Sequence, residues 1–344
     1  MERIDPASTL AALVRRLGAS PSLVLCHNDA DGLAAGALLA TGLRRAGGEA
    51  HIRIVGRGED PWSLRLRAEI AARAPGGLLV TDLGIRAEPL ALGLPTLFVD
   101  HHVPRGFPEG AMVITGYGDE PQPTSSLLAY RAASGIAPME DLIWLAALGI
   151  IGDMAEGGGF PELLEARRRY GITSLRKAAS LVNQPRRAPA GDASPALALL
   201  LKADGPKAVL SGEHPETAQL EAAREAVRSE LGSARRVPPR VVGDVALIRF
   251  ASPAQVHPLV AQAWAGRLRG KIVLAANTGY RPGWVHFAAR SAEPVDLIAF
   301  LAAHAPEGAD GQYGGGHARA SGGALRLTDW PVFLDRIGFG EAAT

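Results

Sequence analysis

Three short apolar runs in the first hundred residues each stop at acidic or histidine side chains. Run 22–26 leads into His27, Asp29 and Asp31, run 77–81 ends at Asp82, and run 95–99 ends at Asp100, His101 and His102. Amphipathic, helix-like stretches separate the first runs, which is typical of β-strands joined by helices in a parallel sheet. Because ligands bind at the carboxyl ends of such strands, the pattern predicts an open α/β sheet with a functional site along one edge.

The group Asp100-His101-His102 is the hardest to explain without a ligand, because burying such groups without a partner is costly. Imidazole and carboxylate together suit divalent ions such as manganese, iron or zinc. The complete set of candidate ligands is His27, Asp29, Asp31, Asp82, Asp100, His101, His102 and Asp153. One ion rarely needs so many groups. Two ions about 3.5–4 Å apart that share a carboxylate form a site for phosphoester hydrolysis.

Each of these residues also has a simpler explanation. An isolated Asp after a strand, such as Asp82, is most often the N-cap of a helix. The group at 27–31 fits a turn with solvated carboxylates, and Asp153 fits a helix end at the surface. Adjacent histidines are more often incidental than metal-binding. The co-occurrence of four acidic groups, three of them at strand ends of one domain, favours the metal site.

Together these motifs resemble the DHH phosphoesterase superfamily, and the resemblance runs over nearly the whole chain. The matching segments, in order, are His27-Asn-Asp29-Ala-Asp31-Gly32, Asp82, Asp100-His101-His102, Gly152-Asp153 and Gly314-Gly-Gly-His317-Ala-Arg-Ala-Ser321-Gly322, the last of which resembles the DHHA1 domain. The resemblance implies an α/β fold in which a mostly parallel-sheet DHH domain precedes a smaller α/β DHHA1 domain. We expect a catalytic DHH domain with a two-metal site at 1–190, a helical connector at 191–238 and a substrate-binding DHHA1 domain at 239–344.

The resemblance also implies a role for each motif residue. The metal ligands would be His27, Asp29, Asp31, Asp82, His101 and Asp153, with Asp82 shared by both ions. Asp100 and His102 would complete the catalytic group, behind the ligands or facing the phosphate. The substrate contacts would be Arg290, Ser291, Gly314, Gly315, Gly316 and His317. Independently of the resemblance, successive small residues let backbone N–H groups approach an anion. A tight turn is the alternative explanation of these glycines.

By the same resemblance the chain would be a hydrolase, a metal-dependent phosphodiesterase or exonuclease that cuts short single-stranded oligonucleotides to mononucleotides. Its cofactors would be two divalent ions, manganese first, with magnesium or cobalt as alternatives. Its length is similar to the nanoRNase, or NrnA-like, branch, whereas the His-x-Asp-x-Asp spacing is similar to RecJ-like members. Four alternatives stay open: a RecJ-like single-stranded-DNA exonuclease, a nucleotide-bisphosphate phosphatase, a cyclic-dinucleotide phosphodiesterase and a non-catalytic nucleic-acid-binding relative.

Composition limits the partners. Lys and Arg number 36 against 35 Asp and Glu, and this balance excludes a strongly basic surface for coating long nucleic acids. The partner expected is a short single-stranded RNA or DNA, or a small nucleotide. The single cysteine, Cys26, excludes an intramolecular disulfide and favours a cytoplasmic protein. No apolar run approaches the ~18 residues of a membrane span, so no membrane is expected. The sequence leaves open whether the chain forms a homodimer.

Overall fold

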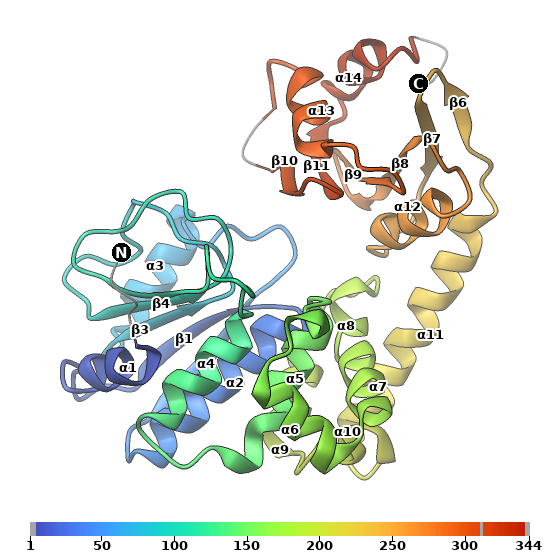
Figure 1. The fold of residues 1–344 in the computed structure, drawn as a ribbon. Coiled ribbons are helices and arrows are strands. Elements are labelled where there is room, and N and C mark those ends of the chain that lie inside the picture. Colours follow the sequence, from blue (N-terminus) through green and yellow to red (C-terminus); the bar gives the residue numbers. More distant parts are fainter. Residues whose placement is uncertain (1–4, 310–311, 341–344) are drawn as a thin grey trace. The chain divides into compact units, whose positions relative to one another are not determined.

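The computed structural model describes residues 5–309 and 312–340, which form two compact units (Figure 1). The first unit comprises the residues up to 186 together with 191–222, and the second comprises 187–190 and the residues from 223 onward. The segment 191–238, predicted as a connector, is therefore divided between the two units. Each unit has its own sheet and its own apolar core.

The first unit contains a five-stranded sheet in the order β2-β1-β3-β4-β5, and every pair of neighbours is parallel. Its strands are β1 (Ser22–His27), β2 (Ala50–Val55), β3 (Leu78–Thr81), β4 (Thr96–Asp100) and β5 (Met112–Thr115). The parallel sheet predicted from the apolar runs is confirmed. Because β1 pairs with β2 on one side and β3 on the other, the order of the strands reverses between β1 and β3. Such a switch point is where open α/β sheets bind ligands.

Helices cover both faces of this sheet, which explains why its strands are apolar runs without polar alternation. Leu23 and Leu25 of β1 belong to a cluster with Leu66 and Ile70 of α3, whereas Val24 and Cys26 belong to the larger cluster around α2, α4 and α5. The helices that begin in this unit are α1 (Pro6–Val14), α2 (Ala30–Arg45), α3 (Leu64–Arg73), α4 (Ser125–Ser134), α5 (Ile143–Gly152), α6 (Pro161–Tyr170), α7 (Ile172–Val182), α8 (Gln184–Arg187), α9 (Ser194–Lys202), α10 (Pro206–Ser211) and α11 (Pro215–Arg235).

The second unit contains a six-stranded sheet in the order β10-β11-β9-β8-β7-β6, in which only β7 and β8 pair in parallel. Its elements are β6 (Arg240–Val242), β7 (Val245–Phe250), α12 (His257–Ala265), β8 (Ile272–Arg281), β9 (Trp284–Ser291), α13 (Leu297–Ala303), β10 (Tyr313–His317), β11 (Ala320–Arg326) and α14 (Trp330–Arg336). Val260 and Ala261 of α12 pack on one face, and α13 and α14 pack on the other. The predicted second α/β domain is confirmed.

The glycine-rich segment near the C-terminus is a strand, not the tight turn that was the alternative explanation of its glycines. It forms β10, which pairs with β11 through a register shift between Tyr313 and Gly315. Gly314 and Gly316 have positive φ values of 75° and 120°. A Cβ at Gly316 would lie 2.4 Å from the carbonyl oxygen of Ala320, so this strand passes too close to its neighbour for a side chain.

Candidate metal centre

The first motif lies where β1 ends and α2 begins. His27 is the last residue of β1, and Asp29 caps α2 by accepting a 3.0 Å hydrogen bond from the N–H of Gly32. A Cβ at residue 32 would lie 2.7 Å from the carbonyl oxygen of His27, so only glycine fits this tight turn. Nδ1 of His27 lies 3.0 Å from the Asp29 carboxylate. The local fold of the motif therefore brings its ligand groups together.

Asp82 follows β3 and is not the N-cap of a helix, because no helix follows it before β4. Its φ of 62° is left-handed, which is uncommon for a residue other than glycine. The buried carboxylate lies 3.3 Å from Nδ1 of His27 and 3.5 Å from Nε2 of His101, and it accepts a 3.0 Å hydrogen bond from Oγ of Ser125. Asp82 therefore stands between the first and third motifs.

Asp31 is fully buried and is held by the N-terminus of another helix. Its carboxylate accepts hydrogen bonds from the backbone N–H groups of Ser125 (2.9 Å) and Ser126 (3.0 Å), in the first turn of α4. The helix dipole favours negative charge at this position. Asp153 caps the C-terminus of α5, and its carboxylate lies 3.2 Å from Nε2 of His101. Helices α4 and α5 thus add two carboxylates to the strand-end groups.

All six predicted metal ligands, together with His102, come together in three overlapping sets. In each set the potential ligand atoms lie within 4.8 Å of one another. The sets are His27, Asp29 and Asp82; Asp82, His101 and His102; and Asp31, His101 and Asp153. Asp82 and His101 each belong to two sets, so one carboxylate and one imidazole connect the whole group.

Asp100, the remaining residue of the third motif, shapes the turn that carries the histidines. Its buried carboxylate accepts hydrogen bonds from the N–H groups of Gly84 (2.7 Å) and His102 (2.8 Å). It also lies 2.9 Å from Nδ1 of His102. These bonds, after the opposing effect of burial, keep the pKa of Asp100 below its usual value.

The electrostatics of this group indicate an excess of buried acid. Burial and then the charges of Asp31 and Asp82 raise the pKa of Asp153 to about 9. Burial and the charge of Asp82 raise the pKa of Asp31 to about 6. Although burial opposes protonation of His101, the surrounding carboxylates raise its pKa to about 10. Nearby positive charge favours the ionised form of such crowded carboxylates, and a bound cation would supply it.

The donor set fits a divalent cation. Nε2 of His101 is buried, faces two carboxylates and makes no hydrogen bond with a described residue. A cation placed among these groups would satisfy it. Every donor is a carboxylate oxygen or an imidazole nitrogen, a combination that suits manganese or magnesium better than a thiolate-bound zinc. Cys26 supplies no thiolate, because it is buried in the apolar core.

The predicted substrate residues lie in the second unit. Arg290 donates hydrogen bonds to the carbonyl oxygens of Ala289 (2.8 Å) and Ser321 (3.1 Å). Ser291 leaves β9 on the opposite face and accepts a 3.1 Å hydrogen bond from the N–H of Glu293. The sheet register places the backbone of His317 beside Ala320, and Ala320 beside Arg290. The side chain of His317 lies outside the described part of the chain.

Sequence analysis missed four residues that hold the ligands. Ser125 donates hydrogen bonds to both Asp31 and Asp82, and the backbone N–H of Ser126 donates one to Asp31. Asn183 accepts a 3.0 Å hydrogen bond from the N–H of Ala30, and Arg186 lies 3.8 Å from the Asp29 carboxylate. Only the pairing of distant segments reveals these roles.

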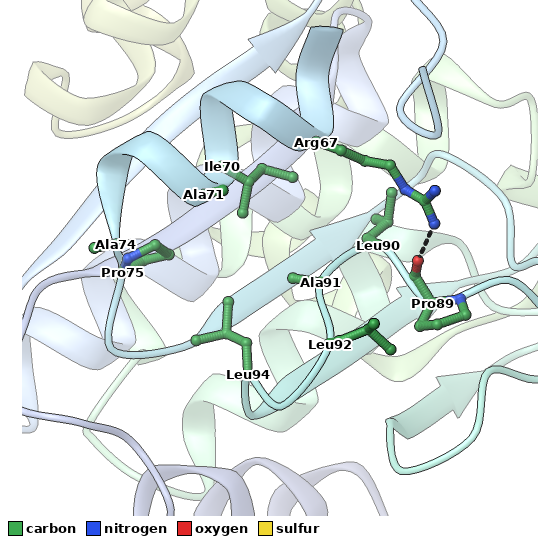
Figure 2. A pocket seen from close by; sticks show the side chains of 10 residues that line it. All are labelled: Arg67, Ile70, Ala71, Ala74, Pro75, Pro89, Leu90, Ala91, Leu92 and Leu94. Carbon is green, nitrogen blue, oxygen red and sulfur yellow. Dashed lines mark hydrogen bonds between the residues drawn. The ribbon is translucent and has the colours of Figure 1, made fainter. Parts of the chain in front are cut away.

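An apolar pocket of about 440 Å³ lies elsewhere in the first unit, between α3 and the segment 89–94 (Figure 2). Figure 2 shows Leu90 and Leu94 on one wall, Ile70 on the other, and Arg67 donating a hydrogen bond to the carbonyl oxygen of Pro89. None of its lining residues is a candidate ligand. Within the described residues, no helix is both long and apolar enough to cross a membrane.

Comparisons with known proteins identify the fold. No protein-family model matches the sequence, and no curated protein matches it either. Among solved structures, RecJ from Thermus thermophilus with Mn²⁺ matches at 24% identity with a TM-score of 0.70, covering 98% of this chain and 54% of the other. This chain thus spans about half of that RecJ. An exonuclease RecJ bound to manganese matches at 22% identity with a TM-score of 0.65, covering 98% of this chain and 94% of the other. The DHH domain of a member of the s1p family of ribosomal proteins matches at 16% identity with a TM-score of 0.62. That match covers 96% of this chain and 88% of the other.

Proposed function

We propose that this chain, which has the two-domain fold of DHH/DHHA1 proteins, is a metal-dependent phosphoesterase that hydrolyses short single-stranded oligonucleotides to mononucleotides. The observation that carries the proposal is the position of Asp82. Its carboxylate belongs to two sets of potential ligands that also contain His27, Asp29 and His101. A carboxylate shared in this way is the feature that a two-ion hydrolytic site requires.

We assign His27, Asp29 and Asp82 to one ion, and Asp31, Asp82, His101 and Asp153 to the other. Manganese is the expected metal, with magnesium or cobalt as alternatives, and the two RecJ structures above contain manganese. When bound, such ions lower the pKa of water and stabilise negative charge on the attacking and leaving oxygens.

The chain's own residues orient this site. Ser125 directs a carboxylate oxygen of Asp82 through its hydroxyl, and the amides of α4 fix both oxygens of Asp31. Asp100 holds the backbone of His102, which keeps that imidazole 3.9 Å from the carboxylate of Asp82. Here it is placed to contact a phosphate oxygen or to pass a proton to the leaving group. Such positioning accounts for a large part of phosphoryl-transfer catalysis.

In the second unit we assign the substrate phosphate to Arg290, Ser291, the backbone of Gly314, Gly315 and Gly316, and His317. The guanidinium of Arg290 is largely buried, and burial lowers its pKa. Its printed hydrogen bonds go to backbone carbonyl oxygens, and among the described residues it forms no ion pair, so an anionic substrate could supply the opposite charge. Ser291 lies on the other face of β9 from Arg290, where its hydroxyl accepts a hydrogen bond from the N–H of Glu293.

A RecJ-like exonuclease acting on long single-stranded DNA is the second candidate. It is favoured by the similarity of this fold to an exonuclease RecJ over 94% of that chain. The charge balance of this chain, with 36 basic and 35 acidic residues, favours the shorter substrate, because a long strand needs many phosphates neutralised.

The test is manganese-dependent hydrolysis of a 5′-phosphorylated RNA dinucleotide and of a long single-stranded DNA. We expect faster turnover of the dinucleotide, whereas processive degradation of the long strand would favour the RecJ-like alternative. Asp82→Asn should abolish both activities, because asparagine tolerates the left-handed backbone but is not an anion. The control is Asp204→Asn, at an exposed position in the same unit. Activity near that of the wild type in Asp82→Asn would overturn the two-metal assignment.

A further inference from the structure

Helix α5 ends at the metal centre in a turn that glycine normally supplies. The N–H of Met154 donates to the carbonyl oxygen of Ile151 (3.1 Å), and the N–H of Ala155 donates to that of Ile150 (2.9 Å). These two bonds form a Schellman motif, with Asp153 as the C-cap and Met154 as the residue that follows it. Met154 accordingly has a left-handed φ of 58°. Glycine is the usual residue at this position, because a residue with a Cβ is strained there.

The side chain of Met154 gains no packing in the core that would offset this strain. It is 86% exposed, whereas its neighbours Ile151 and Ala155 pack against the core of the first unit. An exposed methionine leaves apolar surface in water, and a left-handed methionine is less favourable than a left-handed glycine. The free chain is therefore less stable with methionine at this position than with glycine. A residue held under strain beside a functional site points to a role in binding or catalysis.

Met154 lies at the rim of the candidate metal centre. It directly follows Asp153, whose carboxylate is 3.2 Å from Nε2 of His101. Two residues beyond His101, Val103 is also exposed, by 65%. Consecutive Cα atoms are about 3.8 Å apart, so neither apolar residue stands far from the pair formed by His101 and Asp153. Exposed apolar side chains therefore stand beside the group that would hold the metal.

The chemistry of this rim suits a nucleobase better than a second phosphate. Four aspartates of the predicted ligand set crowd the centre, so a phosphate placed beyond the cations would meet repulsion. A base carries no charge, and its flat faces are apolar. A methionine side chain is unbranched and polarisable, so it adapts to rings of different shape and makes favourable contacts between its sulfur and an aromatic ring.

We propose that Met154 contacts the base of the nucleotide whose phosphate is held at the metal centre. This inference rests on the proposed function and adds a substrate contact in the first unit. The side chain is exposed in the free chain and is covered by the base in the complex. The contact adds affinity without selecting one base, because a thioether offers only a weak hydrogen-bond acceptor to a base edge.

The test compares two ligands that differ only in the base, adenosine 5′-monophosphate and ribose 5-phosphate. Calorimetric titration of the full chain, with manganese present, gives the Kd of each. The wild type should bind the nucleotide about tenfold more tightly than the sugar phosphate. In Met154→Gly this ratio should fall to about twofold, although Tm should rise by about 2–4 °C, because glycine relieves the left-handed strain. Met154→Leu keeps an apolar side chain and should retain most of the ratio.

The matched control is Ala74→Gly, at the end of α3. Ala74 is exposed and also has a left-handed φ, of 42°, but it lines the apolar pocket of Figure 2 and not the metal centre. This variant should gain stability to a similar extent, and its ratio of the two affinities should stay that of the wild type. The control thereby separates loss of the methionine side chain from relief of backbone strain.

A wild-type ratio in Met154→Gly would overturn the inference. An equal loss of affinity for both ligands, or weaker binding of manganese, would also overturn it, because either result would place the effect at Asp153. Since the readout is binding and not turnover, failure of the proposed function is seen separately, in the hydrolysis of the two oligonucleotides. A wild type that hydrolyses neither, yet binds the nucleotide through Met154, would refute that function and support this contact.

Discussion

Oγ of Ser125 donates a 3.0 Å hydrogen bond to Oδ1 of Asp82, although 43 residues separate them in the sequence. The same residue gives its backbone N–H to Asp31, so α4 orients two carboxylates of the candidate metal centre at once. Partners of this kind, one step removed from the metal, set the orientation and basicity of the ligands.

Ser125→Ala should therefore weaken manganese binding by about 10- to 100-fold, with a similar loss of activity. The backbone bonds to Asp31 remain, so the fold should persist. The control is Ser211→Ala, because its exposed hydroxyl donates to the carbonyl oxygen of Ala208 at 3.0 Å and touches no candidate ligand. Calorimetric titration of both variants with manganese measures the difference. Equal affinities in the two variants would contradict a role for Ser125 in orienting Asp82.

Metal binding should stabilise the fold, because the unfolded chain lacks the assembled ligands. Manganese at about 100 times its dissociation constant should add about 2.7 kcal/mol to the free energy of unfolding. Thermal unfolding with manganese and with a chelator measures the shift in Tm.

Asp82→Asn should lose this shift, yet its metal-free form should be at least as stable as the wild type. The substitution removes one charge from the group that raises the pKa of Asp153 and Asp31. An undiminished Tm shift in Asp82→Asn would place the metal elsewhere.

Gly149 allows α5 to pack against the metal centre. A Cβ at this position would lie 2.0 Å from Oγ of Ser126 and 2.2 Å from Oδ1 of Asp31. Gly149→Ala should therefore destabilise the chain by about 1–3 kcal/mol and weaken metal binding. Gly232 is a matched control inside α11, because a Cβ there would meet no atom within 4 Å. Gly232→Ala should be stabilising by up to about 1 kcal/mol. Urea unfolding should show that Gly149→Ala lowers the free energy of unfolding and that Gly232→Ala raises it. Changes of the same sign in both variants would contradict this packing.

His257 should make the second unit sensitive to acid. It is 5% exposed, and burial, followed by the charges of His286 and Arg290, lowers its pKa to about 3. In the unfolded chain its pKa is about 6.5, so between these values the unfolded state binds the extra proton. His257 therefore leaves the free energy of unfolding unchanged above about pH 6.5. As the pH falls below that value, the free energy of unfolding decreases, by about 2 kcal/mol at pH 5.

Between pH 7.5 and pH 5, the free energy of unfolding of His257→Gln should fall less than that of the wild type, and the difference should be about 2 kcal/mol. Urea unfolding of both proteins at the two pH values measures this difference, in which the other histidines cancel. An identical pH dependence in the two proteins would show that His257 binds protons alike in the folded and unfolded states, and thus that folding does not lower its pKa.

Much of the site could be predicted from local pattern. The apolar runs at 22–26, 77–81 and 95–99 indicated strands buried on both faces, and parallel strands bring their carboxyl ends to one edge. That geometry alone places His27, Asp82 and His101 near one another. The glycine-rich segment could not be assigned in the same way, because its strand exists only through pairing with β11, a contact that leaves no apolar alternation in β10.

By itself, the sequence determined the fold class and the candidate ligands, because apolar periodicity and strand-end chemistry are local properties of the chain. Only the tertiary structure decided that Ser125 meets Asp82, that Asp82 caps no helix, and that His101 meets Asp153. Each of these relationships joins side chains from separate elements, and their distances depend on how those elements pack and pair. No local pattern contains that information, because the same residues at the same spacing would be solvated in another arrangement.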